Sequence, residues 1–440
     1  MNMLVIEGGT VITMDGARRV ERADVLVEDG QIAAVGSMTM PIGTPTLQAH
    51  GCLVLPGLIQ AHTHVCQTLC RGAADDLHLL EWLRERVWPY EASLDERAMR
   101  ACARLAAAEL LLGGTTTILD MGTVHETDTL FDTLGRTGLR ATAGKAMMDA
   151  GDGVPARMRE ETRRSLDESD ALSARWDGTF AGRMHYAYAP RFVLSCTDGL
   201  LREVGARVRG SARVHTHASE QQAEIALVRK ERGADNIAYF AALGIGGPRA
   251  TLAHCVHATP EERRLLAREG TNVTHCPSSN LKLGSGIAPI PEMLAEGIHV
   301  ALGADGAPCN NNLDAFVELR LAALLHKPRV GPAGMTALQA LELATLGGAR
   351  ALGLEAELGS IEPGKRADLI VIDPGAPHVA PSPDPVSTVV YAAQSRDVRH
   401  VLVDGRLLVR DGQLTELSGL ERGEVVATAR AEAARLRAKS

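Results

Sequence analysis

Two histidines separated by a single residue, His62 and His64, follow the apolar run Val54–Ile59. The run predicts a buried strand, and side chains alternate between the two faces of a strand. Both imidazoles are therefore expected to point to the same side, at the place where the strand ends. A converging pair of this kind supplies half of the ligands of a zinc-type metal site.

Later segments repeat this design, in which an apolar or β-branched run ends in a group able to bind metal or transfer protons. These groups are His217 with Glu220, His254, His275 and Asp305. The carboxyl ends of the strands of a parallel barrel meet on one face, so we expect the groups to gather there. His215 lies two residues before His217 and is expected to point to the same side of the strand, but deeper in the barrel. We interpret it as a residue that fills the barrel interior or as a partner of a ligand.

Alternating β and α patterns over residues 55–354 predict an α/β fold, a (β/α)8 TIM barrel. Its strands are expected near residues 54–64, 115–122, 140–148, 183–190, 212–217, 250–256, 271–276 and 299–304. Short β segments separated by Gly and Asp-Gly turns occupy residues 1–54 and return after residue 355. Neither end has enough strands to bury a face alone. We therefore expect residues 1–54 and 355–440 to form one small β-sandwich domain beside the barrel.

The composition of the 440 residues excludes several classes of protein. A formal net charge of −8 leaves no basic surface for nucleic acid or an anionic membrane. No apolar run is long enough to predict a membrane-spanning helix. The eight cysteines have no regular spacing, so we expect buried thiols in a cytoplasmic protein instead of a disulfide framework. Association into a homo-oligomer is also expected.

The ordered set His-x-His, His-x-x-Glu, His, His and Asp-Gly over a barrel resembles the amidohydrolase superfamily, across nearly the whole chain. Several stretches are similar to the adenosine-type aminohydrolases, which act on S-adenosylhomocysteine, methylthioadenosine and 5′-deoxyadenosine; the triazine hydrolases are related to the same group. These stretches are residues 71–77, 81–83, 277–289 and 303–312.

The resemblance implies one divalent metal ion, with zinc favoured over iron or manganese, held by His62, His64, His217 and Asp305. Such an ion lowers the pKa of bound water from about 15.7 to roughly 7 and so provides hydroxide at neutral pH. Glu220 would shuttle protons to the purine ring, Asp305 would accept the water proton, and His254 would orient the hydroxide. A second metal is not expected, because the predicted fourth strand has no lysine to bridge two ions.

The resemblance also implies a small purine nucleoside as the partner, a 5′-modified adenosine. 5′-Deoxyadenosine and methylthioadenosine are favoured, and S-adenosylhomocysteine stays open. Glu91 aligns with a carboxylate that binds the ribose hydroxyls, and Arg191 aligns with a histidine that contacts the sugar in relatives. The residues expected to contact the substrate are Trp82, Glu91, Lys145, Arg157, Arg191 and Cys309.

Two alternatives remain. One is a different aminohydrolase or chlorohydrolase of the same group, acting on guanine, 8-oxoguanine or a triazine; Glu220 and Glu91 favour the nucleoside over these. The other is a barrel without catalysis that serves as a scaffold, which the intact ligand set disfavours. The sequence leaves the roles of His257, His275 and Lys282 open.

Overall fold

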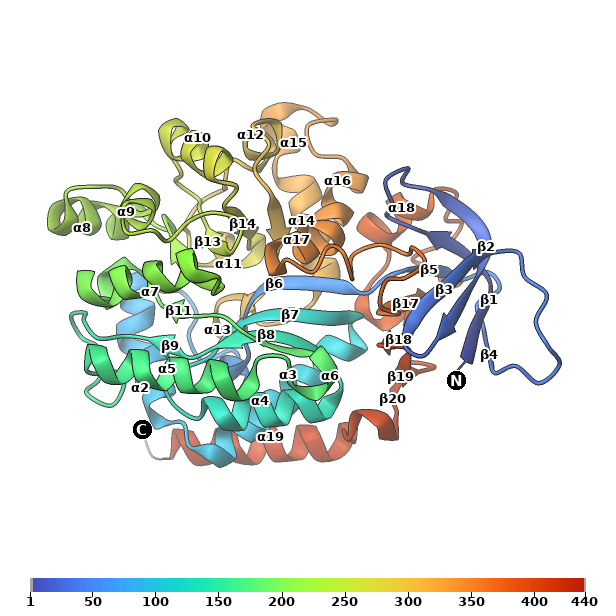
Figure 1. Ribbon diagram of the computed structural model, residues 1–440, viewed down its shortest axis with the longest axis horizontal. Helices are drawn as coiled ribbons and strands as arrows, with labels where there is room; N and C mark the ends of the chain where they lie inside the picture. The colour runs from blue at the N-terminus through green and yellow to red at the C-terminus, as the bar shows by residue number, and fades with distance from the viewer. Residues whose placement is uncertain (1–2, 439–440) are drawn as a thin grey trace.

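The computed structural model describes residues 3–438 of the chain. Its centre is a set of parallel strands that are almost wholly buried, with helices packed around them (Figure 1). The longer strands are β6 (Leu58–His64), β7 (Thr115–Met121), β8 (Arg140–Gly144), β10 (Met184–Tyr186), β12 (Val214–Ala218), β13 (Ala250–His254), β14 (Asn272–His275) and β15 (Val300–Leu302). Two-residue strands continue three of them: β9 (Ala146–Met147), β11 (Ala189–Pro190) and β16 (Asp305–Gly306).

Hydrogen bonds join the strands in the orders β10-β8-β7-β6-β16 and β12-β13-β14-β15, with the pair β11-β9 beside them. β16 follows β15 in the chain and pairs with β6, where Asp305 lies opposite Thr63. A parallel bridge between Tyr188 and Val214 links the two groups of strands elsewhere. The pairing of β6 with β16 brings the His-x-His segment next to the Asp-Gly segment, although some 240 residues separate them in the chain.

Helices follow most of these strands and pack on their outer side. The longer ones are α3 (Glu96–Leu112), α4 (Thr127–Thr137), α5 (Thr162–Trp176), α7 (Asp198–Gly210), α8 (Gln222–Arg232), α9 (Asn236–Ala242), α10 (Pro260–Glu269), α14 (Ala315–Leu325) and α19 (Arg422–Arg437). Short helices lie in the connections: α1 (Leu79–Trp82), α2 (Trp88–Ser93), α6 (Thr179–Gly182), α11 (Pro277–Lys282), α12 (Ile290–Ala295), α13 (Ala307–Asn310), α15 (Lys327–Val330), α16 (Ala337–Glu342), α17 (Gly348–Leu352) and α18 (Pro385–Ser387). Single turns of 3-10 or π geometry are η1 (Val65–Cys70), η2 (Leu83–Val87), η3 (Val193–Ser195), η4 (Leu343–Gly347), η5 (Thr388–Ala392), η6 (Ser395–Asp397) and η7 (Glu416–Ser418). Within the described residues, each helix is too short or too polar to cross a membrane.

The helix α10 illustrates how local sequence sets these boundaries. The Thr259 hydroxyl accepts a hydrogen bond from the backbone N–H of Glu262, and Pro260 occupies the first turn, where no N–H is needed. Gly270 ends the helix in a left-handed conformation with φ of 72°, which glycine adopts without steric cost. Both ends of α10 are therefore set by residues of its own sequence.

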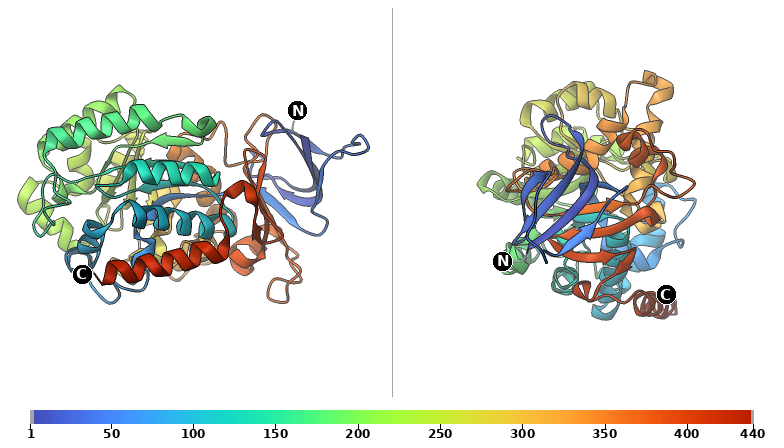
Figure 2. Two further views of the ribbon diagram at one scale, coloured as in Figure 1. Left: turned by 90° about the horizontal axis from the view of Figure 1, so that it is seen from below. Right: turned by 90° about the vertical axis from the view of Figure 1, so that its right-hand side faces the viewer.

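The two ends of the chain form one mixed sheet at one end of the molecule (Figures 1 and 2). Its order is β20-β19-β18-β17-β5-β1-β2-β3, and β4 pairs with β1. The strands are β1 (Met3–Ile12), β2 (Val20–Glu28), β3 (Gln31–Gly36), β4 (Thr46–Gln48), β5 (Leu53–Pro56), β17 (Leu369–Ile372), β18 (Val398–Val403), β19 (Arg406–Arg410) and β20 (Gln413–Leu414). β5 and β17 join the ends, with Leu55 opposite Ile370.

A buried arginine fastens this terminal sheet to the central strands. Arg140, the first residue of β8, donates two hydrogen bonds to the carboxylate of Asp368, of 2.9 and 3.1 Å. It donates a third, of 2.6 Å, to Asp404 in the turn between β18 and β19. Because all three side chains are nearly inaccessible to solvent, the attachment depends on this charge pairing being complete.

Candidate active site

Three imidazoles and one carboxylate converge where β6 and β12 end and β16 begins. The distance from His62 Nε2 to Asp305 Oδ1 is 3.2 Å, and that from His64 Nε2 to the same oxygen is 3.4 Å. His217 completes the group, with its Nε2 3.1 Å from Nε2 of His64. The side chains that the sequence predicted as metal ligands therefore meet at one point.

The protonation state of two of these imidazoles follows from their second ring nitrogen. His64 Nδ1 lies 2.8 Å from the backbone carbonyl oxygen of Met121, and His217 Nδ1 lies 2.7 Å from that of Arg191. A carbonyl oxygen only accepts, so both Nδ1 atoms must carry the proton. The lone pairs of both Nε2 atoms then face each other and the Asp305 carboxylate. This arrangement of electron pairs is unfavourable unless a cation lies between them.

His215 contacts the third imidazole of the group, that of His62. Its Nε2 lies 2.7 Å from Nδ1 of His62, and both residues are fully buried. In the tautomer in which His62 Nδ1 donates to His215, Nε2 of His62 is a bare acceptor, and this atom has no hydrogen-bond partner among residues 3–438. Burial lowers the pKa of His62, so the ring stays neutral and able to bind a metal.

Three of the six separations among the four ligand atoms have the length expected around a tetrahedral metal ion. Ligands at about 2.0–2.2 Å from zinc, at tetrahedral angles, lie about 3.4 Å from one another. The separations of 3.1–3.4 Å within the group agree with this value. His254 is also near, since ligand atoms of His62, His217, His254 and Asp305 all lie within 4.8 Å of one another. Its Nε2 is 3.8 Å from Asp305 Oδ2, so we place it beside the ion instead of on it.

The backbone is strained at three residues of the site. Ser219, His254 and Asp305 have φ values of 51°, 72° and 62°, a left-handed region that costs a residue with a side chain about 1–3 kcal/mol. A strained backbone conformation persists only where surrounding contacts stabilise it, and such conformations are concentrated at functional sites. Asp305 is held by the Ser279 hydroxyl, which donates to Oδ2 at 2.6 Å, and by the Gly306 N–H, which donates to Oδ1 at 2.8 Å.

Glu220 lies directly beside the ligand group. Its Oε2 is 3.6 Å from Nε2 of His254, and its Oε1 accepts a weak hydrogen bond of 3.4 Å from the Ser285 hydroxyl. Its backbone N–H donates to Glu224 at 3.0 Å, which fixes the loop at the start of α8. Burial raises the pKa of Glu220, so its acid form persists to higher pH than in an exposed glutamate.

His254 is oriented by Asn280, whose side-chain oxygen lies 2.9 Å from Nδ1. Burial alone would lower the pKa of His254, but the carboxylates of Glu220 and Asp305 outweigh it and raise the pKa. Conversely, burial would raise the pKa of Asp305, yet the imidazoles around it, His62 first, hold it well below its usual range. The site thus contains a buried acid, a buried base and an ionised carboxylate within a few ångströms.

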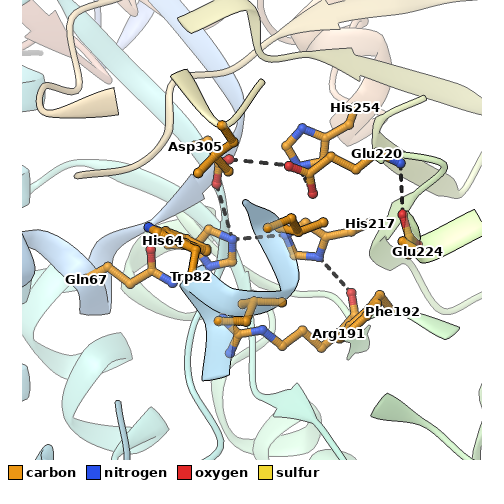
Figure 3. A pocket seen from close by; sticks show the side chains of 13 residues that line it. His64, Gln67, Trp82, Arg191, Phe192, His217, Glu220, Glu224, His254 and Asp305 are labelled. Carbon is orange, nitrogen blue, oxygen red and sulfur yellow. Dashed lines mark hydrogen bonds and ion pairs between the residues drawn. The ribbon is translucent and has the colours of Figure 1, made fainter. Parts of the chain in front are cut away.

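These groups border a partly open cavity, shown from close by in Figure 3. Its free volume is about 30 Å³, whereas pockets that hold drug-sized ligands have about 300–1,000 Å³. Leu79 and Trp82 of α1 and Leu83 of η2 form an apolar wall of the cavity. A ligand of nucleoside size therefore needs more room than the cavity has in this structure.

Two of the predicted substrate-contact residues, Trp82 and Arg191, line the cavity. Glu91 lies behind Arg191 and is wholly buried. Cys309 is buried as well, and its thiol donates to the Gly306 carbonyl oxygen at 3.0 Å. Arg157 is exposed to solvent and donates to the Ala92 carbonyl oxygen at 2.8 Å.

Lys145 faces α5 instead of the cavity, where it contacts Glu160 and donates to the Ser165 hydroxyl at 3.2 Å. Lys282 contacts Asp75 and donates to the Pro308 carbonyl oxygen at 2.9 Å, which ties two loops together.

His257 and His275, the two histidines whose roles the sequence left open, also lie outside the cavity. His257 Nε2 lies 2.8 Å from the Ser285 carbonyl oxygen. His275 is buried beside His326, with 5.6 Å between ring centroids, and burial lowers its pKa to about 3.

Sequence reasoning missed three polar or aromatic residues that line the cavity: Gln67, Phe192 and Glu224. Each is a near neighbour of a predicted residue. Gln67 lies one turn after His64, Phe192 follows Arg191, and Glu224 is one helical turn after Glu220. Helical spacing from His64 and Glu220 could have identified Gln67 and Glu224.

The chain matches the model of a protein family described as "Amidohydrolase family" over residues 53–408. It is 42% identical over 417 residues to a 5-methylthioadenosine/S-adenosylhomocysteine deaminase of Halobacterium salinarum, covering 93% of each chain. It is 38% identical over 436 residues to a 5′-deoxyadenosine deaminase of Methanothermobacter thermautotrophicus, covering 98% of each.

Among solved structures, an adenosine deaminase from Xanthomonas campestris with bound zinc superposes with a TM-score of 0.92. That chain is 32% identical, and the match covers 99% of this chain and 98% of that one. The resemblance seen in the sequence motifs is confirmed by these matches. The protein belongs to the amidohydrolase family.

Proposed function

We propose that this protein is a metal-dependent hydrolase that removes the 6-amino group of a 5′-modified adenosine, giving the inosine analogue and ammonia. 5′-Deoxyadenosine and methylthioadenosine are the favoured substrates, and S-adenosylhomocysteine is a third candidate. The observation that carries the proposal is a buried carboxyl group, Glu220, beside converging metal ligands in one cavity. The names of the two relatives support the choice of substrate.

The proposed ligands of a single divalent ion are His62, His64, His217 and Asp305, because their facing lone pairs need a cation. An ion bound there would polarise water and make it nucleophilic at neutral pH. Zinc is favoured, since three neutral imidazoles and one carboxylate suit it and the Xanthomonas structure contains it.

The chain's own residues would move the protons. Asp305, ionised and held by Ser279, would accept a proton from the attacking water. Glu220 in its acid form would donate to a ring nitrogen of the purine, so that C6 accepts the oxygen. His254 would stabilise the charge that develops at C6. As the C6–N bond breaks, the amino group would take the proton that Asp305 accepted and leave as ammonia, and the proton of the C6 hydroxyl would return to Glu220.

Ammonia release from a panel of adenosine analogues that differ at the 5′ position tests this proposal. We expect the fastest turnover with 5′-deoxyadenosine or methylthioadenosine, and slower or no turnover of guanine and aminotriazines included in the same panel. Glu220→Gln should retain its metal content and lose about 10²–10⁴-fold in kcat. Full activity of this variant, or a panel without any deaminated nucleoside, would contradict the proposal.

We further propose that the parallel strands close into a (β/α)8 barrel over residues 55–354. The parallel bridge between Tyr188 and Val214 supports closure. Residues 1–54 and 355–440 are proposed as the second domain, a small β-sandwich, and the shared sheet of β5 and β17 supports this division. The eight free thiols agree with the expected cytoplasmic location. The homo-oligomer stays a prediction, to be tested by light scattering.

A further inference from the structure

Two neighbouring segments of the chain hold the strained residue Asp305 in place. One is α11, from which the Ser279 hydroxyl donates to Asp305 Oδ2 at 2.6 Å. The other is α13, whose last residue, Asn310, donates from Nδ2 to the carbonyl oxygen of Ala304 at 2.8 Å. Ala304 directly precedes Asp305. Since a left-handed backbone persists only where its surroundings hold it, the placement of Asp305 depends on how firmly α11 and α13 are anchored.

Both segments are anchored to a single side chain, that of Glu318 in α14. Its Oε2 accepts from the backbone N–H of Ser278 at 3.1 Å. Its Oε1 accepts from the Ser278 hydroxyl and, at 2.9 Å, from Asn310 Nδ2. Glu318 is 1% exposed, so water compensates little for the loss of any of these donors. A buried carboxylate with donors on both oxygens is a firm anchor, because hydrogen bonds to a charged group are stronger than those between neutral groups.

The helix α11 also orients a second group of the proposed mechanism. Asn280, two residues after Ser278, has its side-chain oxygen 2.9 Å from His254 Nδ1. Figure 3 shows His254 and Asp305 at the same end of the cavity, and 3.8 Å separates Nε2 from Oδ2. α11 therefore fixes both groups relative to each other, and Glu318 fixes α11.

Glu318 itself lies outside the cavity. Over residues 3–438, the cavity wall includes no residue of α14, and Ser278 and Asn310 are not part of it either. We propose that Glu318 is a positioning residue of the deamination, which holds α11 and α13 so that Asp305 and His254 keep their places, without contacting the substrate. This inference rests on the proposed function and adds to it a residue of the outer helical layer.

Glu318→Gln tests this assignment with little change in size. Glutamine has one acceptor oxygen where the carboxylate has two, so its NH2 group would face the N–H of Ser278 or the amide of Asn310. We expect kcat to fall at least about tenfold, since the loss of outer partners of metal ligands costs about 10–100-fold. The KM for 5′-deoxyadenosine should stay as in wild type, because no contact with the substrate is removed.

Zinc affinity provides a measurement that does not depend on turnover. Competition with a chelator should show affinity about tenfold weaker in Glu318→Gln, because Asp305 is a proposed ligand. Burial raises the pKa of Glu318 to about 7. All proteins are therefore compared at about pH 8.5, where the carboxylate is ionised.

Asp397→Asn is the matched control. Asp397 is also buried, and it lies directly before β18 of the terminal sheet. Its Oδ2 accepts from the backbone N–H of Gln394 at 2.9 Å and lies 2.9 Å from His378 Nε2. The control should lower the free energy of unfolding, measured in urea, but leave kcat, KM and zinc affinity as in wild type.

The double variant Glu318→Gln/Ser279→Ala shows whether Glu318 acts through α11. Its loss in kcat should be smaller than the product of the two single losses, because Ser279 belongs to the segment that Glu318 holds. If Glu318→Gln does not fold, Asn310→Ala takes its place, since it removes one contact of the anchor and retains those of Ser278. Its kcat should also fall while its KM stays unchanged.

Three results would overturn the inference. They are wild-type kcat and zinc affinity in Glu318→Gln, a KM that rises while kcat stays unchanged, and losses that multiply fully in the double variant. If wild type releases no ammonia from any nucleoside, the proposed function fails instead. The zinc affinities of wild type, Glu318→Gln and Asp397→Asn then decide the assignment, and equal values would refute the role of Glu318.

Discussion

Replacing Arg140 with Met should loosen the attachment of the terminal sheet to the central strands. Methionine retains the apolar part of the arginine side chain, but it has no hydrogen-bond donor for Asp368 or Asp404. The side chains of Arg140, Asp368 and Asp404 are 3%, 4% and 11% exposed, so water compensates little for the loss. The two carboxylates would then lie close together in a poorly solvated place.

The size of the effect follows from what remains around each carboxylate. Removing one partner of a buried ion pair costs about 3–5 kcal/mol. Asp404 keeps two other arginines within range, Arg183 at 3.5 Å and Arg366 at 3.7 Å. Asp368 keeps a hydrogen bond of 2.8 Å from the backbone N–H of Asp404. We therefore expect a loss near the lower limit, about 3 kcal/mol in the free energy of unfolding.

Urea unfolding of the metal-loaded protein, followed by circular dichroism, measures this loss. The matched control is Arg136→Met, which removes an ion pair with Asp132 on the surface, where the arginine is 70% exposed. Exposed pairs contribute about 0–1 kcal/mol, so the control should unfold close to wild type. If Arg140→Met is no less stable than Arg136→Met, the reasoning about a buried attachment is wrong.

Three further predictions concern residues near the ligands and away from them. His215→Leu should weaken metal binding by about 10–100-fold, because it removes the partner of His62 Nδ1. Competition with a chelator measures the affinity. An unchanged affinity would refute the role of His215 as the partner of a metal ligand. Lys145→Met should lower the free energy of unfolding by about 3–5 kcal/mol, because it leaves the buried Glu160 unpaired. The KM of the variant should equal that of wild type for substrates with every 5′ substituent. A KM that rises for one substituent would show that Lys145 contacts the substrate. Burial lowers the pKa of His400 to about 4 from its ordinary 6.5, so the stability that its neutral ring provides is complete above pH 6.5 and is lost as the pH falls toward 4. Between pH 7 and about pH 4.5, the free energy of unfolding of His400→Gln should therefore fall less than that of wild type. Urea unfolding at several pH values measures this, and an equal fall in both proteins would contradict the prediction.

The sequence predicted which histidines and which aspartate come together because the signals are local. An apolar run followed by histidine or aspartate marks a strand end, and parallel strands bring such ends to one face. The predicted strand at residues 140–148 is instead divided into β8 and β9. At this division a side chain on Gly144 would lie 1.9 Å from the Ala187 carbonyl oxygen, so two backbones approach closely there. No local pattern reveals such an approach.

The substrate-facing wall was harder to predict than the ligands. The resemblance placed Glu91 against the sugar, but the residue bonded to it decides whether its carboxylate is free. Arg191 lies 100 residues further along the chain, and its side chain covers Glu91. Pairing between such distant side chains depends on the packed structure, and no local sequence pattern predicts it.

His62, His64, His217 and Asp305 are proposed to hold one ion that the reaction requires. The most direct measurement is a titration of chelator-treated protein with zinc, in which bound metal and ammonia release from 5′-deoxyadenosine are followed together. We predict that activity rises with bound zinc and reaches its plateau at one equivalent per chain, and that His62→Ala shows neither. Full turnover by metal-free protein, or a plateau at two equivalents, would contradict the account.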